Sequence, residues 1–123
     1  MMYYKISRAE QDRARAVDLC EFLMMYDWSR FSESDSGYIF DLENPTWVGS
    51  THANWWYDNA PNAEHKNGNI IDWLMYMSGE NYTFQEAVKI LLAYVDGGEW
   101  KTYLRRPKVD RFAHLKPEDM PFN

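Results

Sequence analysis

The chain has 123 residues, of which 46% are hydrophobic and 17% aromatic, and its formal net charge is −6. This length suits one domain, and a chain so rich in apolar side chains has enough surface to bury, which argues against intrinsic disorder. No apolar run reaches the ~18 residues that a membrane-spanning helix needs, and Met1–Ile6 lacks the apolar stretch of a signal peptide. We therefore expect a cytoplasmic protein that is not embedded in a membrane. Its one cysteine, Cys20, cannot form an internal disulfide.

The charge is distributed unevenly along the chain. Residues 31–100 carry two basic side chains against eleven acidic ones, whereas residues 101–123 carry six basic against three acidic ones. Affinity for phosphate backbones depends on Lys and Arg, so an acidic body is a poor partner for nucleic acid. Only the basic C-terminal segment could reverse this.

The first predicted element is a helix over Ser7–Tyr26. Ser7 and Glu10 have the spacing of a capping box, and apolar residues then recur at intervals of three and four. Cys20 falls on the apolar side of this helix and is expected to be a small buried residue, with a catalytic thiol as the weaker alternative. The polar residues 27–37 are predicted to form a loop.

Three short strands are predicted after this loop. The segments rich in aromatic and β-branched residues are Tyr38–Leu42, Thr46–Val48 and Asn54–Asp58, separated by Asn and Pro residues that break regular structure. We expect an antiparallel meander of three to four strands. The register cannot be predicted here, because too many aromatic residues follow one another.

Two helices with clear terminal signals come next. Asn69 is placed to cap the first helix, Asp72 lies at its third position, and Gly79 suits a left-handed C-terminus. Thr83 and Glu86 have the spacing of a capping box for the second helix. The two predicted helices are residues 69–78 and 83–95, and residues 99–104 are expected to add one more helical turn.

The segment Gly68–Val88 also carries a family resemblance. Gly-Asn-Ile-Ile-Asp-Trp-Leu-Met, followed after a short turn by Tyr-Thr-Phe-Gln-Glu-Ala-Val, resembles the end of the zinc-ribbon domain at the front of bacterial and phage primases. It is even more similar to the cysteine-poor version of that domain at the N-terminus of primase-like, toprim-containing proteins of conjugative elements. The resemblance covers about Ser7–Val95, but only Gly68–Val88 has the full motif.

We therefore predict an α+β fold that resembles a zinc ribbon without zinc. A small antiparallel sheet of three to four strands would be flanked by an N-terminal helix and a C-terminal helical hairpin. Residues 1–98 would form this degenerate primase-type domain, and residues 99–123 a basic, proline-containing C-terminal extension.

The resemblance also indicates where zinc ligands would lie. In primases a Cys-x-x-His pair and a Cys-x-x-Cys pair hold the metal, and these would align with Asp41–Asn44 and with residues 57–66, where this chain has no cysteine. A zinc site made of His and carboxylate ligands is conceivable, but scattered surface residues explain these side chains more simply. We predict no metal and no cofactor. The candidate His and carboxylate ligands of such a zinc site are His52, His65, Asp58 and Glu64.

An aromatic core is the expected substitute for zinc, because large rings bury ample area and can brace short strands. Its predicted members are Phe40, Trp47, Trp55, Trp56 and Tyr57.

No catalytic pattern is recognisable. The sequence has no Gly-rich phosphate loop, no catalytic triad pattern and no zinc-protease helix. Asp41 and Glu43 alternate along a predicted strand and could form a carboxylate pair, but such residues near a turn are more often solvated. We predict that the protein is not an enzyme.

Two binding functions remain. The first is a non-catalytic accessory module of a mobile genetic element (a phage or a conjugative element) that binds single-stranded nucleic acid or the replication machinery. Exposed aromatic rings would stack on bases, and basic side chains would hold phosphates. The predicted residues are Trp47, Trp55, Trp56, Tyr57, Lys101, Arg105, Arg106, Lys108 and Arg111.

The alternative is an acidic inhibitor of a host nucleic-acid enzyme, anti-CRISPR-like or otherwise directed against host defence. Acidic side chains and exposed aromatic rings of this protein would then form a surface that docks on a basic channel of the partner. At least half of the aromatic residues are expected to pack in the core. The predicted acidic contacts are Asp41, Glu43, Asp58 and Glu64.

Overall fold

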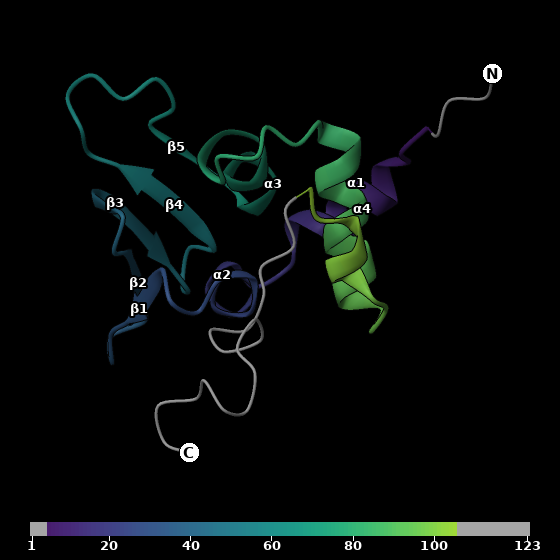
Figure 1. The fold of residues 1–123 in the computed structure, drawn as a ribbon, viewed down its shortest axis with the longest axis horizontal. Helices are drawn as coiled ribbons and strands as arrows, with labels where there is room; N and C mark the ends of the chain where they lie inside the picture. The colour runs from purple at the N-terminus through teal and green to yellow at the C-terminus, as the bar shows by residue number, and fades with distance from the viewer. Residues whose placement is uncertain (1–4, 106–123) are drawn as a thin grey trace, which may run out of the picture.

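The computed structural model describes residues 5–105, whose strands form one antiparallel sheet that helices cover on a single face (Figure 1). The predicted α+β class is confirmed, but the sheet has five strands rather than three to four. Each strand pairs with the next one along the chain, so the sheet is an open meander. The strands are β1 (Phe31–Glu33), β2 (Tyr38–Asp41), β3 (Asn44–Ser50), β4 (Trp55–Asp58) and β5 (Asn67–Gly68).

Three strands differ from the prediction for reasons of tertiary pairing, and one of them, β5, forms only by pairing with β4. β1 lies inside the segment predicted to be a loop, because its three residues form a strand only by pairing with β2, where Phe31 is opposite Asp41. β3 begins before the predicted strand and includes Pro45. The register between β2 and β3 shifts at this end, and such an irregularity tolerates a residue without a backbone N–H.

The helical elements are α1 (Arg8–Arg15), α2 (Leu19–Tyr26), α3 (Ile70–Asp72), the π-helical turn η1 (Trp73–Met77), α4 (Phe84–Val95) and the 3-10 turn η2 (Trp100–Tyr103). The prediction of one continuous N-terminal helix is wrong, because α1 ends and α2 restarts at its own cap. Asp18 accepts a hydrogen bond from the backbone N–H of Glu21 at 3.0 Å. No helix within residues 5–105 combines the length and the apolar character needed to cross a membrane.

A side chain from the sheet stabilises the break between α1 and α2. Asn54, in the turn between β3 and β4, donates through Nδ2 to the carbonyls of Arg15 and Val17 at 3.2 and 3.0 Å. Its Oδ1 accepts from the backbone N–H of Leu19 at 2.8 Å. One amide group therefore satisfies backbone groups on both sides of the break.

The predicted caps of the two later helices are confirmed. Asn69 and Asp72 exchange side chain–backbone hydrogen bonds at 3.0 Å each, and Thr83 and Glu86 form the second box at 3.1 and 2.9 Å. Gly79 has the expected left-handed conformation, with φ at +83°. After Asp72, however, the first helix widens into η1.

The helices lie in two layers behind the sheet. α2 and α3 lie between the sheet and an outer layer formed by α1 and α4 (Figure 1). Aromatic rings link the layers: Trp47 stacks on Trp56 at 6.4 Å, and Phe31 lies 5.8 Å from Trp47 and 5.7 Å from Trp73. Trp73 in turn contacts Tyr26 on α2 at 5.4 Å.

The chain of ring contacts continues to the C-terminal end of the described residues. Phe22 on α2 contacts Tyr94 at 5.1 Å and Trp100 at 5.2 Å. Trp100 and Leu104 are buried, so the first residues of the predicted C-terminal extension pack in the same core as residues 5–98. Cys20 is also buried, as predicted.

Candidate binding surface

The alternation of side chains along the strands divides the sheet into a buried and an exposed face. On β2, Ile39 is fully buried, whereas Tyr38 and Phe40 are 43% and 44% exposed. On β4, Trp56 is fully buried, whereas Tyr57 is 44% exposed. α2 and α3 cover one face of the sheet (Figure 1). The aromatic side chains that alternate to the other face are therefore exposed to solvent.

The strand register places the exposed residues in two adjacent rows across the sheet. One row runs Ser32, Phe40, Val48, Tyr57, Asn67, and the other runs Tyr38, Ser50, Trp55. We call these eight residues the outer sheet face. None of them is charged.

Four of these residues are aromatic, and they occupy the corners of a rectangle. Phe40 and Tyr57 are separated by one strand, as are Tyr38 and Trp55, which corresponds to about 10 Å at the usual strand spacing. Along each strand the two aromatic residues are two positions apart, with one residue between them, which corresponds to about 7 Å. The indole Nε1 of Trp55 donates to Asn67 Oδ1 at 3.2 Å, which orients that ring.

The structure divides the predicted aromatic residues between the core and the surface. Trp47 and Trp56 are buried and unavailable for stacking on a ligand. Of the five rings predicted for the aromatic core, only these two lie in it. Phe40 and Tyr57 are exposed and Trp55 is half-buried on the outer sheet face, which corrects the placement of all three in that core. Sequence reasoning missed Tyr38, although the alternation within Tyr38–Asp41 was a signal for it.

Asp41 is not a free acid, which corrects its placement on a partner-binding surface. Its side chain is 1% exposed and accepts from Nε and Nη2 of Arg30 at 3.0 and 2.8 Å. Burial alone would lower the pKa of the Arg30 guanidinium, but its hydrogen bonds and charge interaction with Asp41 outweigh burial and raise the pKa. Glu43 reaches Arg30 at 3.4 Å and stays 68% exposed.

Asp58 is also engaged inside the protein. Its carboxylate accepts from Thr46 Oγ1 at 2.6 Å, from Asn44 Nδ2 at 3.1 Å and from the backbone N–H of Ala60 at 3.0 Å. Burial works to raise the pKa of Asp58, but these hydrogen bonds outweigh it and the pKa is lowered. These contacts join the start of β3 to the end of β4, near the two places that the resemblance aligns with zinc ligands.

The residues considered for a zinc site are not brought together. The His65 ring stacks on Tyr76 of η1, with centroids 3.8 Å apart and planes at 7°, whereas His52 lies against Gly37 at the β1–β2 turn. Glu64 is 91% exposed and its carboxylate lies 3.9 Å from His65. Within residues 5–105, no group of three or more His, Cys, Asp or Glu side chains is arranged to hold a metal ion.

The basic residues predicted to hold phosphates lie away from the outer sheet face wherever the structure describes them. Arg105 Nη2 donates to Glu86 on α4 at 2.6 Å, and Lys101 Nζ lies 5.6 Å from the Trp100 ring centroid. α4 lies in the helical layer farthest from the sheet (Figure 1). Arg106, Lys108 and Arg111 lie outside the described residues.

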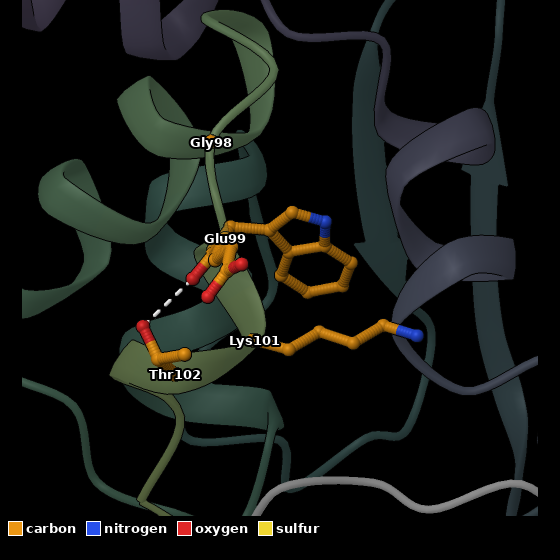
Figure 2. Close-up of a pocket in the computed structure, with 5 residues that line it drawn as sticks. Gly98, Glu99, Lys101 and Thr102 are labelled. Carbon is orange, nitrogen blue, oxygen red and sulfur yellow. Dashed lines mark hydrogen bonds between the residues drawn. The ribbon is translucent and has the colours of Figure 1, made fainter.

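The neighbouring segment Gly98–Thr102 lines a surface hollow (Figure 2). Thr102 Oγ1 donates to the carbonyl of Glu99 at 2.7 Å, and the side chains of Lys101 and Thr102 point away from each other (Figure 2). All five lining residues belong to one turn of chain, and their polar groups do not converge on the hollow. The outer sheet face is therefore the stronger candidate site.

No protein-family model matches this chain, and neither does any curated protein. The resemblance to primase zinc ribbons stays a prediction.

Proposed function

We propose that this protein is a non-catalytic binding module that contacts its partner through the outer sheet face. The observation that carries the proposal is the grouping of four aromatic residues, without a charge among the eight outward residues, on the face of the sheet that the described helices leave open. Contiguous exposed apolar surface usually marks an interaction site, and Tyr and Trp commonly supply the anchors of interfaces.

The charge distribution favours a protein as the partner. Residues 5–105 carry nine Lys and Arg side chains against sixteen Asp and Glu side chains. Of the predicted phosphate-binding residues within the described range, Arg105 is paired with Glu86 and Lys101 lies over Trp100. Because DNA affinity comes mainly from Lys and Arg that neutralise phosphates, the outer sheet face is better suited to polypeptide than to nucleic acid.

The resemblance of Gly68–Val88 to primase-type domains suggests which partner to look for. We infer an accessory role in a phage or conjugative element, with a protein of the replication machinery as the partner. Inhibition of a host nucleic-acid enzyme, as by an anti-CRISPR-like protein, would use the same acidic protein and the same aromatic surface.

Single-stranded nucleic acid is the second candidate, and the ring spacing supports it. Two rings about 7 Å apart along one strand of the sheet can each stack on a base. Phosphate contacts would then have to come from basic residues such as Arg106 and Lys108, outside the described residues.

The first test is capture of binding partners from host lysate by the immobilised protein and by two variants. Phe40→Ser changes the outer sheet face, and Tyr103→Ser is the control, because Tyr103 is an exposed aromatic residue on η2, away from that face. A protein held by the wild type and by the control, but lost with Phe40→Ser, supports the proposal. Capture that is unchanged by Phe40→Ser contradicts it.

The second test is a fluorescence-anisotropy titration of labelled single-stranded and double-stranded DNA over a salt series. Tight single-strand binding that weakens with salt and is lost with Phe40→Ser would favour nucleic acid over protein. We expect weak or no binding even at low salt.

A further inference from the structure

We propose that the outer sheet face recognises a basic protein segment through its arginine side chains, an inference that rests on the proposed function. The guanidinium groups would stack on the aromatic rings, and carboxylates near the ends of the strands would balance the positive charge of the segment. Two features of the structure carry this choice of partner, namely the open rings and the acidic border around them.

The rings are open and of the right kind. Phe40, Tyr57 and Tyr38 are each between 43% and 44% exposed, and Trp55 is partly exposed beside them. A guanidinium group is planar and more weakly hydrated than an ammonium group, so it stacks on aromatic faces more readily than lysine does. The cation–π pairs found among the described residues involve Phe31, Trp73 and Trp100, none of which belongs to the outer sheet face.

The border of the face is acidic. Asp35 lies in the β1–β2 turn and Glu64 in the β4–β5 loop, whereas Glu33 pairs with the buried Ile39 and Glu43 lies 3.4 Å from Arg30, so these two face the helix-covered side. All four are exposed, with side-chain exposures of 68% for Glu43 and 91% for Glu64. Lys66 is the one Lys or Arg in residues 31–69. This border attracts a cationic segment and repels phosphates.

The protein binds one of its own arginines with the same combination of groups. The guanidinium of Arg30 lies 5.6 Å from the ring centroid of Phe31 and 5.3 Å from that of Trp73, while Asp41 accepts two of its hydrogen bonds. Rings and carboxylates therefore hold a guanidinium on the buried side of the sheet. The outer sheet face offers rings to a guanidinium from outside, and the carboxylates come from the turns and loops beside it.

The test compares two labelled peptides of equal length and charge, one of arginine and glycine and the other of lysine and glycine, in anisotropy titrations with the full chain. We expect the arginine peptide to bind about 5-fold more tightly, because stacking of the guanidinium adds to charge attraction. Both affinities should fall as salt is added.

Variants then assign the binding to the face. Phe40→Ala and, separately, Tyr57→Ala should weaken arginine-peptide binding about 5-fold and leave lysine-peptide binding nearly unchanged. Tyr103→Ala is the matched control and should change neither. Asp35→Asn combined with Glu64→Gln should weaken binding of both peptides and flatten its salt dependence. Far-UV circular dichroism of each variant verifies its folding, and Phe40 and Tyr57 provide two independent substitutions.

Three results would overturn the inference in distinguishable ways. Equal binding of the two peptides, or arginine binding unchanged by both ring variants, rejects arginine recognition; the lysate test of Phe40→Ser then still decides the proposed function. Tighter binding of oligo-deoxythymidine, lost with Phe40→Ala, identifies nucleic acid as the ligand of the face. Self-association by analytical ultracentrifugation, lost with Phe40→Ala, identifies a second copy of the chain.

Discussion

Arg30 holds Asp41 in a two-point ion pair, with Nε and Nη2 donating to the two carboxylate oxygens at 3.0 and 2.8 Å. The side chains are 12% and 1% exposed. Arg30 also donates to the carbonyl of Met77 at 3.3 Å, so the pair connects the sheet with the end of η1. A buried pair of this kind costs desolvation energy, and its removal from one side leaves a charge without its partner.

Asp41→Asn should therefore destabilise the protein by about 3 kcal/mol, because Arg30 would keep its charge in a largely buried position. Urea denaturation monitored by tryptophan fluorescence measures the change. Glu43→Gln is the control, since Glu43 is 68% exposed and its pairing with Arg30 should contribute less than about 1 kcal/mol. Equal losses for the two variants would contradict this account.

Gly68→Ala should destabilise the protein by about 1–3 kcal/mol through overpacking. A β-carbon at Gly68 would lie 2.6 Å from Cβ and 2.7 Å from Oδ2 of Asp72, whose carboxylate accepts from the backbone N–H of Asn69. Gly98→Ala is the matched control, because its β-carbon would meet no atom closer than 3.4 Å. Thermal unfolding compares the two, and a loss no larger at Gly68 than at Gly98 would reject the steric explanation.

Trp55 and Trp56 should respond very differently to alanine. Trp56 is fully buried and its Nε1 donates to the carbonyl of Asn69 at 2.8 Å, so Trp56→Ala should cost about 3–5 kcal/mol. Trp55 lies on the outer sheet face, and Trp55→Ala should cost about 1 kcal/mol or less. Denaturation midpoints decide the order, and a larger loss at Trp55 would mean that the register of β4 is wrong.

Glu86 should make stability depend on acid pH. Its pKa is lowered, chiefly by the hydrogen bond from Arg105 and next by the backbone N–H of Thr83. A carboxyl with a lowered pKa in the folded state stabilises fully above its ordinary pKa, near 4.5, and this contribution is lost as pH falls through the folded pKa. Wild type should therefore exceed Glu86→Gln in stability at neutral pH, and the difference should shrink below about pH 4.5.

Urea denaturation of both proteins at a series of pH values measures that difference. Glu64→Gln is the matched control for removing one carboxylate, because the Glu64 side chain is 91% exposed. A difference between wild type and Glu86→Gln that is constant from neutral to acid pH would mean that the charge of Glu86 is not the cause.

The sequence predicted helix starts well because a cap depends on residues three positions apart. Asn69 with Asp72, and Thr83 with Glu86, form the expected hydrogen bonds. The break between α1 and α2 was not predictable in the same way. Asp18 with Glu21 is a local cap signal for α2, but Asn54, which lies 35 positions after Leu19, also satisfies backbone groups there, and no local pattern announces so distant a partner.

The candidate site was predicted only in part because it depends on strand register. Trp55 and Tyr57 were correctly placed on a strand, but the sequence alone did not separate them from Trp56, which points to the other face. Phe40 becomes part of the site only through its pairing with Val48, which in turn pairs with Tyr57. Such cross-strand neighbours are set by tertiary pairing rather than by any one segment.

The two outermost strands also limit how another molecule can attach to the sheet. β1 has three residues and β5 has two, so each margin offers few unpaired backbone groups for an added strand. A strand from another molecule therefore finds few groups to pair with at either edge. Such pairing is a frequent route to fibre formation. Under the proposed function, contact with a partner would therefore fall to the side chains that stand out from the sheet, and substitutions there would alter the choice of partner while leaving the strand pairing in place.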